Sequence, residues 1–412
     1  MEASSQYVKH QWVALFATLI FFFNSFLLPE GLTIVLLFTP VWAYFLYLQK
    51  RWAIVICLLI PLIFYAIVHI TEGVSLRYYL VSVTMLSCLI IFTVCCYYFV
   101  NSIKVDWDLI FRNIAILNFL FVLLSLPLLF IPLLKPFVWY LKPISDNIAE
   151  IPRLKLFVEE ASHYSYWLAP IAIYFYCKVL FFKPPKSFFT LFIVTLPLLF
   201  SFALGALTVL LISSLLTIAI YSQRIFRLKQ GKYFFIATIF ALPVILIVCY
   251  NYFPNNILFH RIHNIFNGDD TSVRGRTYEA FILANKIVSQ KSYWWGIGPG
   301  QLKLSGRNIV LQYYQYVNVP QTVRIPNACA ETIVYFGYAG FAIRLLVQLF
   351  LFFRTKVFSN PYRFWLFLFV FIYQFAGSYI TNVAEYIIYI FVFSPVFPEF
   401  KKATNQLINL KP

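Results

Sequence analysis

The feature that most constrains this fold is a succession of long apolar runs that continues along the whole chain. Sixty-two per cent of the 412 residues are hydrophobic and only 11% are charged. Soluble domains average about 25% charged residues. A chain this apolar cannot hide its hydrophobic side chains in a water-soluble core, so lipid must solvate part of them. We therefore expect an all-α polytopic membrane protein.

About twelve of these runs approach the roughly 20 apolar residues that a helix needs to cross a bilayer. The expected spans are 12–28, 31–48, 52–70, 78–100, 113–134, 163–183, 187–203, 205–222, 233–253, 327–352, 363–380 and 383–398. The first run is followed by no small-residue cleavage motif, so it reads as a membrane helix and not as a signal peptide.

The distribution of charge predicts how these spans are oriented. The net charge is +17, from 32 Lys and Arg against 15 Asp and Glu. The cations are dispersed over short loops, which favours the positive-inside rule over nucleic-acid binding. Loops on one side carry Lys50, Arg51, Arg112, Lys178, Arg354, Lys356 and Arg363, among others. We therefore expect both termini on the cytoplasmic side.

Two larger loops fall on the outer side and divide the chain. The expected segments are helices in 1–134, a first outer loop in 135–162, helices in 163–253, a large outer loop in 254–326, and helices with a cytoplasmic C-terminus in 327–412. Long ordered loops are often functional. An apolar-periodic stretch near 276–290 predicts helical pieces that lie against the outer end of the bundle.

The large outer loop is rich in cations, although outer loops normally lack them. It contains Arg261, Arg274, Arg276, Lys286, Lys291, Lys303, Arg307 and Arg324, with only three acids. Anionic lipid headgroups are one explanation. We favour an anionic ligand such as a phosphate, because the planar fork of Arg binds two oxygens at once.

The first outer loop ends in "IPRLKLFVEEASHYSYWLAP", which places Arg153, Glu159, Glu160 and His163 just before a membrane helix. A carboxylate beside an imidazole can accept a proton from a sugar hydroxyl. The alternative is an interfacial ion cluster that caps the helix.

The tenth expected span begins "PNACAETIVYFGYAG", with Asn327 and Glu331 four residues apart on one helical face. A carboxylate at the membrane edge is costly unless it is hydrated or paired. Glu331 therefore marks a water-filled opening or a partner Arg.

Other patterns argue against cofactors. His260, His263, Asp269 and Asp270 match no standard metal-site spacing, so we expect no metal. The glycine cluster within 296–300 follows no strand, which favours tight turns over a nucleotide site.

Three segments together resemble the bacterial O-antigen polymerase (Wzy-type) family, which shares a superfamily with the O-antigen ligases. They are "RLKLFVEEASHYS", the small-residue segment "SFALGALTVLLISSLL", and the stretch from Arg276 to "GIGPG" that is followed by "PNACAETIVYFGYAG". The resemblance covers much of 150–345. The ligase branch has a His near the position of Asn327, so this departure favours a polymerase.

The resemblance implies a GT-C-like membrane glycosyltransferase bundle with no cofactor. Such an enzyme would join undecaprenyl-pyrophosphate-linked oligosaccharide repeat units at the outer face of the bacterial inner membrane. Its implied partners are that lipid-linked oligosaccharide, membrane lipids and a chain-length regulator protein, with no nucleic acid.

Fixed guanidinium groups would stabilise the charge that develops on a departing pyrophosphate. We assign catalytic roles to Glu160, His163, Arg276 and Glu331, with Glu160 and His163 as the proton-accepting pair and Glu331 as the second choice of base. We assign substrate binding to Arg153, Arg274, Arg307, Arg324 and Asn327.

The alternatives are an O-antigen ligase that transfers glycan to a lipid A core and a lipid-linked oligosaccharide flippase. A flippase is expected to carry charges at mid-depth inside its bundle. Here Arg344 is the main charge within a span, and we expect it close enough to the inner end to snorkel.

Overall fold

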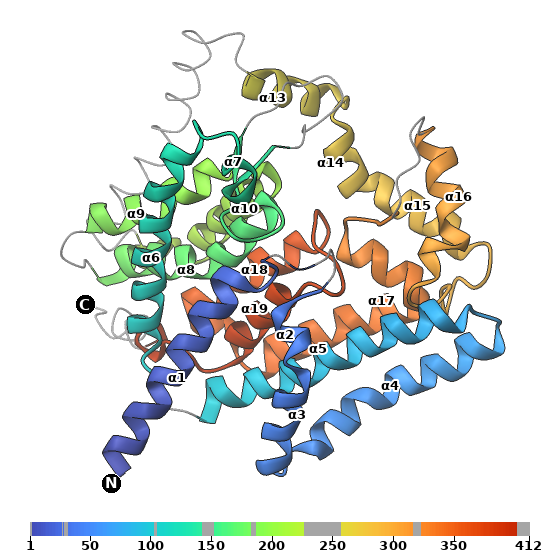
Figure 1. Cartoon of the computed structure of the whole chain (residues 1–412), viewed down its shortest axis with the longest axis horizontal. Helices are drawn as coiled ribbons and strands as arrows, with labels where there is room; N and C mark the ends of the chain where they lie inside the picture. Colours follow the sequence, from blue (N-terminus) through green and yellow to red (C-terminus); the bar gives the residue numbers. More distant parts are fainter. Residues whose placement is uncertain are drawn as a thin grey trace.

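The computed structural model describes residues 2–26, 28, 32–102, 105–141, 152–182, 187–225, 257–315 and 323–401, and within them it is mostly helical (Figure 1). The first half contains α1 (Glu2–Phe23), α2 (Ile34–Leu37), α3 (Thr39–Leu48), α4 (Trp52–Thr71), α5 (Leu76–Ser102), α6 (Trp107–Leu128), α7 (Lys135–Val138), β1 (Trp139–Tyr140), β2 (Arg153–Leu154), α8 (Ala161–Phe182), α9 (Ser187–Phe200), α10 (Leu204–Ile220) and α11 (Ser222–Ile225). The second half contains α13 (Ile257–Asn267), α14 (Thr271–Arg276), α15 (Tyr278–Val288), η1 (Gln301–Lys303), α16 (Ser305–Tyr314), α17 (Ala328–Arg354), η2 (Val357–Ser359), α18 (Pro361–Tyr373) and α19 (Val383–Phe393).

In the described part of the chain, five helices are long and apolar enough to cross a membrane: α4, α5, α6, α8 and α17. Shorter apolar helices include α9, α10, α18 and α19. The protein is therefore a helical, membrane-embedded chain. The expected number of twelve spans is not confirmed, and the expected span 233–253 lies outside the described residues.

Several expected spans end or break where local chemistry dictates. The run 31–48 divides into α2 and α3, with Pro40 in the first turn of α3. The run 363–380 is helical only to Tyr373, because 374–382 forms a loop before α19. Helix α6 begins earlier than expected because the carboxylate of Asp106 caps its N-terminus, accepting from the backbone N–H of Leu109 at 3.1 Å.

Helix α17 was expected to be continuous, but it is broken at Gly337, where φ is 65° and ψ is −171°. The break removes hydrogen bonds within the helix, and the loop that contains residues 293–297 replaces them. The N–H of Ile297 donates to the carbonyl of Val334 at 2.8 Å, and the N–H of Tyr338 donates to the carbonyl of Tyr293 at 2.9 Å. Non-helical backbone is tolerated at membrane depth where protein satisfies its polar groups in this way.

Helices α13 to α16 lie together along one side of the molecule in Figure 1. This bears out the helical pieces that the large outer loop was expected to contain. Helix α15 is amphipathic and buries Ala280, Leu283 and Ile287 in a cluster that also includes Val334 of α17. Helix α15 is thus fixed to the first half of α17.

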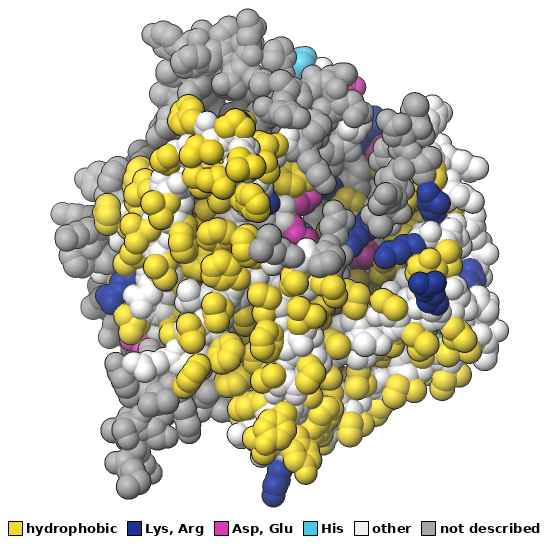
Figure 2. All heavy atoms as spheres, viewed as in Figure 1, with side chains coloured by type: hydrophobic (Ala, Val, Ile, Leu, Met, Phe, Trp, Pro, Cys, Tyr) yellow, Lys and Arg dark blue, Asp and Glu magenta, His cyan; other side chains and the backbone are white. Residues whose placement is uncertain are grey.

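Figure 2 shows hydrophobic side chains over most of the described surface of α3, α4 and α5, whereas Lys and Arg gather near α15 and α16. Ile63 on α4 and Val81 on α5 are each more than half exposed, at 58% and 59%. Apolar side chains exposed on long helices fit contact with lipid.

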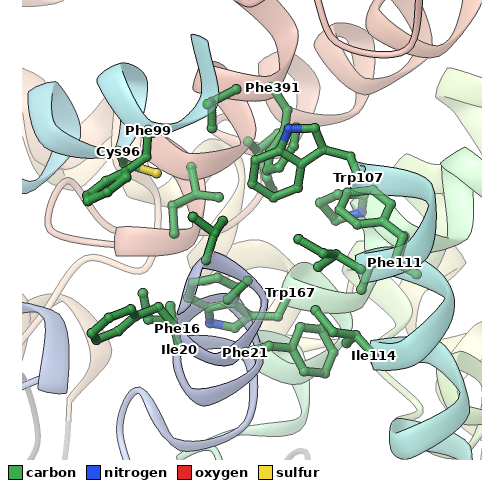
Figure 3. Close-up of a pocket in the computed structure, with 18 of the residues that line it drawn as sticks. Phe16, Ile20, Phe21, Cys96, Phe99, Trp107, Phe111, Ile114, Trp167 and Phe391 are labelled. Carbon is green, nitrogen blue, oxygen red and sulfur yellow. The ribbon is translucent and has the colours of Figure 1, made fainter. Parts of the chain in front are cut away.

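An apolar cavity of about 140 Å³ lies among α1, α3, α5, α6, α8 and α19. Figure 3 shows the aromatic rings that face it, including Phe16, Trp107, Trp167 and Phe391. Its walls are apolar and aromatic side chains that offer almost no groups for acid–base chemistry, so this cavity is not the candidate site.

Arg344 does not snorkel, contrary to the expectation. Its side chain is only 13% exposed and forms an ion pair with Glu385, which is 3% exposed. The Nε of Arg344 donates to the side-chain oxygen of Gln374 at 3.0 Å, and its Nη1 donates to the hydroxyl of Thr332 at 3.1 Å. The break at Gly337 is what allows one helix to bring Thr332 and Arg344, twelve residues apart, into contact.

Candidate active site

The site begins at the β1–β2 pair, which joins the two ends of the first outer loop. Tyr140 and Arg153 are paired across the two strands. The Arg153 guanidinium lies over the Tyr140 ring, 4.7 Å from its centroid. The Tyr140 hydroxyl donates to a carboxylate oxygen of Glu160 at 3.3 Å. Arg153 and Glu160, which are seven residues apart in the sequence, therefore meet around one tyrosine.

Glu160 lies immediately before α8 and is a strong acid in this setting. Burial raises its pKa, but the charges of His163 and Arg276, the hydrogen bond from Ser162 and the charge of Arg153 lower it more, to about 2. The Ser162 hydroxyl donates to Glu160 at 2.6 Å. A carboxylate this acidic stays ionised at neutral pH and is a weak base.

Arg276 comes to this carboxylate from the other outer loop, at the end of α14. Asn327 holds it there, because its side-chain amide donates to the carbonyl of Arg276 at 2.8 Å and to that of Phe375 at 2.7 Å. The Asn327 oxygen also accepts from the N–H of Ala330 at 2.9 Å and so caps α17. The amide expected to bind substrate is thus already occupied by backbone groups, and it positions Arg276 instead.

The Arg276 guanidinium is half-buried, and no hydrogen-bond partner for it lies in the described ranges. Burial lowers its pKa, but Glu160, Tyr373 and Tyr379 act in the opposite direction and leave it above its ordinary value. The side chain is therefore a permanent cation whose donors are available to a ligand.

Tyr379 and two more expected residues complete the group. The Arg324 guanidinium lies over the Tyr379 ring, 5.5 Å from its centroid. The His163 ring meets the same tyrosine edge-on, with centroids 6.4 Å apart. Tyr379 also lies within electrostatic range of Glu160 and Arg276.

Two of the expected cations lie elsewhere. Arg274 forms an ion pair with Glu279 at 2.5 Å and donates to the carbonyl of Gly268 at 3.3 Å. Arg307 lies on α16, where its buried Nε has no hydrogen-bond partner in the described structure. No described contact links Arg274 or Arg307 to Glu160, so the expected grouping of Arg274 with Arg276 is not what the structure shows.

Glu331, the second choice of base, is 5% exposed and accepts from the N–H of Ile380 at 2.7 Å. Arg324 acts on it electrostatically. Its carboxylate thus holds the loop that carries Tyr379, and only indirectly supports the group around Glu160.

Tyr379 was missed in the sequence because it falls inside the expected apolar span 363–380, and Tyr140 was missed as one aromatic residue of the first outer loop. One available signal was "GSYITN", where Gly377, Ser378 and Asn382 interrupt the run, and Asn382 indeed caps α19. Tyr140 carries no comparable signal, since only strand pairing brings it to Arg153.

The described residues contain no cluster of three His, Cys, Asp or Glu side chains able to hold a metal ion. Asp270, one of the acids considered for such a site, is buried and paired with Arg261 at 3.0 Å.

No known family model matches this chain, and no curated protein is similar to it. The site combines three guanidiniums, one carboxylate, one imidazole and two phenols. Such a group can bind an anion, polarise its oxygens and accept a proton.

Proposed function

We propose that this protein is a membrane glycosyltransferase that joins undecaprenyl-pyrophosphate-linked oligosaccharide repeat units, as the polymerases of O-antigen and related surface polysaccharides do. The reaction takes place at the outer face of the bacterial inner membrane. The protein-borne cations, and no metal, stabilise the leaving group.

The observation that carries this proposal is the state of Arg276 and Arg324. Arg276 lies within electrostatic range of Arg153, and both Arg276 and Arg324 act on Tyr379. Neither Arg276 nor Arg324 has a hydrogen-bond acceptor for its side chain in the residues described. Arg276 is half-buried and Arg324 is exposed. Guanidiniums with unfilled donors are suited to a diphosphate, since bidentate contacts to its oxygens are charge-assisted.

In the proposed step, an acceptor hydroxyl oxygen forms a bond to the anomeric carbon of the donor sugar. The bond from that carbon to the diphosphate oxygen breaks, and its electron pair leaves with the undecaprenyl diphosphate. Arg153, Arg276 and Arg324 stabilise this charge most in the transition state.

The acceptor hydroxyl loses its proton to His163 in this scheme. A general base works best when its pKa is near the working pH, and a pKa of about 2 makes Glu160 a poor proton acceptor. Glu160 instead balances the charge of the guanidiniums.

The test is incubation of the purified protein with lipid-linked repeat units, without another enzyme or an energy source. Ladders of longer glycans on the lipid carrier support a polymerase. Transfer to an added lipid A core identifies a ligase, and the absence of any transfer rejects the proposal.

One observation favours the second candidate, a flippase. The Arg344–Glu385 pair is charge buried inside the helical bundle, with Gln374 and Gln348 hydrogen-bonded beside it at 3.0 Å. Buried intramembrane charge often marks a transport path. Movement of a fluorescent lipid-linked saccharide across proteoliposomes, without elongation, would select this candidate.

A further inference from the structure

We propose that Tyr379 is a further catalytic residue, which donates a hydrogen bond from its hydroxyl to the departing diphosphate beside Arg276 and Arg324. This inference rests on the proposed function and adds a neutral donor to its cationic site.

Tyr379 belongs to the loop 374–382, whose shape is fixed by two buried carboxylates. Glu331 accepts from the N–H of Ile380 at 2.7 Å, and Glu385 accepts from the hydroxyl of Ser378 at 2.8 Å. Ser378 has a φ of 66°, a conformation that non-glycine residues rarely adopt. Contacts on both sides of Tyr379 therefore hold the backbone in this position.

The first residues of α17 also hold the loop 374–382 through backbone hydrogen bonds. The N–H of Ala328 donates to the carbonyl of Gly377 at 3.1 Å, and the N–H of Cys329 donates to that of Gln374 at 3.2 Å. Asn327, which positions Arg276, also holds Phe375 at 2.7 Å. The N-terminus of α17 thus positions both the Tyr379 loop and Arg276.

The Tyr379 side chain is half-buried, with its ring between Arg324 and His163. In the part of the chain described, nothing hydrogen-bonds to its hydroxyl. Other tyrosines near the loop differ, since the Tyr386 hydroxyl donates to the carbonyl of Ile380 at 2.8 Å. An unfilled hydroxyl beside two guanidiniums with unfilled donors places three donor groups around one anion.

The hydroxyl remains a donor throughout the reaction. Burial, with the charge of Glu160, raises the pKa of Tyr379 to about 12 against the opposing effect of Arg276. While the bond from the anomeric carbon to the diphosphate oxygen breaks, Tyr379 keeps its proton and shares it with that oxygen. The acceptor's proton still goes to His163, so the balance of atoms is unchanged.

The test compares Tyr379→Phe, which keeps the ring, with the wild type and with Tyr293→Phe. Tyr293 is 49% exposed and lies outside the site, so it is the matched control. We expect Tyr379→Phe to lower kcat about 10-fold, as for one hydrogen bond to a charged group, without changing KM for the acceptor. Inhibition by inorganic pyrophosphate should weaken by a similar factor, while Tyr293→Phe changes neither quantity.

An unchanged kcat and an unchanged pyrophosphate inhibition in Tyr379→Phe overturn the inference. A raised acceptor KM with native inhibition also overturns it, because the hydroxyl would then contact the sugar. Thermal midpoints in detergent show whether each variant is folded. If the wild type elongates nothing, the proposed function fails, and calorimetric binding of pyrophosphate to wild type and Tyr379→Phe still decides whether Tyr379 contacts a diphosphate.

Discussion

The role of each arginine depends on what already fills its donors. Arg274 and Arg276 are two residues apart on α14, yet Arg274 is occupied by Glu279 and Gly268, whereas the Arg276 guanidinium has no such acceptor. Each guanidinium has five donors and cannot lose its proton. Of these two arginines, only Arg276 can therefore offer its full set of donors to a ligand.

Replacing Arg276 with Ala should lower glycan elongation by on the order of 10²- to 10³-fold, the range for losing one preorganised donor group. The elongation activity of Arg276→Lys should lie between that of Arg276→Ala and that of the wild type, because an ammonium keeps the charge but loses the bidentate geometry. The measurement is chain length on a silver-stained gel, with turnover by the purified protein. Lys303→Ala, an exposed cation of the same outer segment, is the control; long chains in Arg276→Ala would reject the role.

Glu160→Gln should destabilise the protein in a pH-dependent way. The folded pKa of about 2 lies below the ordinary 4.5, so the carboxylate contributes stability above about pH 4.5 that is lost as the pH falls towards 2. The full effect is about 3 kcal/mol. Thermal midpoints in detergent should differ between variant and wild type at pH 7 and converge at acid pH. A constant difference across this range would contradict the assignment.

Among the elements, broken helix α17 and the loop that docks into it organise the half of the molecule that carries the candidate site. The loop before α16 inserts backbone groups into the break, while the first half of α17 holds Arg276 and the loop of Tyr379. The break also folds Arg344 back towards Thr332. One broken helix thus contributes to both the candidate site and the buried ion pair.

Gly337→Ala should therefore be poorly tolerated. A Cβ at this position would lie 2.1 Å from the carbonyl oxygen of Trp294, and φ is positive. We expect a loss of at least about 2 kcal/mol, seen as a lower thermal midpoint and less monodisperse protein. Gly205→Ala is the matched control, because its Cβ meets nothing within 4 Å and Ala favours a helix by up to about 1 kcal/mol. Equal stability of the two variants would show that the break is not required.

At the scale of the whole molecule, orientation decides whether the site can meet a substrate outside the cytoplasm. Helices α13 to α16 precede α17 in the chain. The residues of the site lie near the first residues of α8, α17 and α19. The positive-inside rule predicts that these ends face the outside and that the turn around Lys356 faces the inside.

Labelling with a membrane-impermeant maleimide tests this orientation in intact spheroplasts. A cysteine placed at exposed Gln290 should react, whereas one at exposed Lys356 should react only after permeabilisation. The wild-type protein with its native cysteines sets the background. The reverse pattern would put the site in the cytoplasm and end the proposal of an extracytoplasmic transferase.

The amino-acid sequence alone was enough to predict that this protein lies in a membrane and which kinds of residue make up its candidate site. Apolar run length and charge reflect transfer free energies that need no tertiary contacts, so the membrane class and helices such as α4 and α8 could be read directly. The candidates Arg153, Glu160, His163, Arg276 and Arg324 were identified as cations, acid and base in two outer loops, although their roles stay predictions.

Which of these side chains meet depends on how the chain folds in three dimensions. Arg276 reaches Glu160 because Asn327 clamps its backbone, and Arg274 does not because Glu279 takes it first. The break at Gly337 depends on a loop some forty residues earlier that closes on it. Such pairings depend on long-range backbone hydrogen bonds and burial, and the order of residues along one chain does not encode them locally.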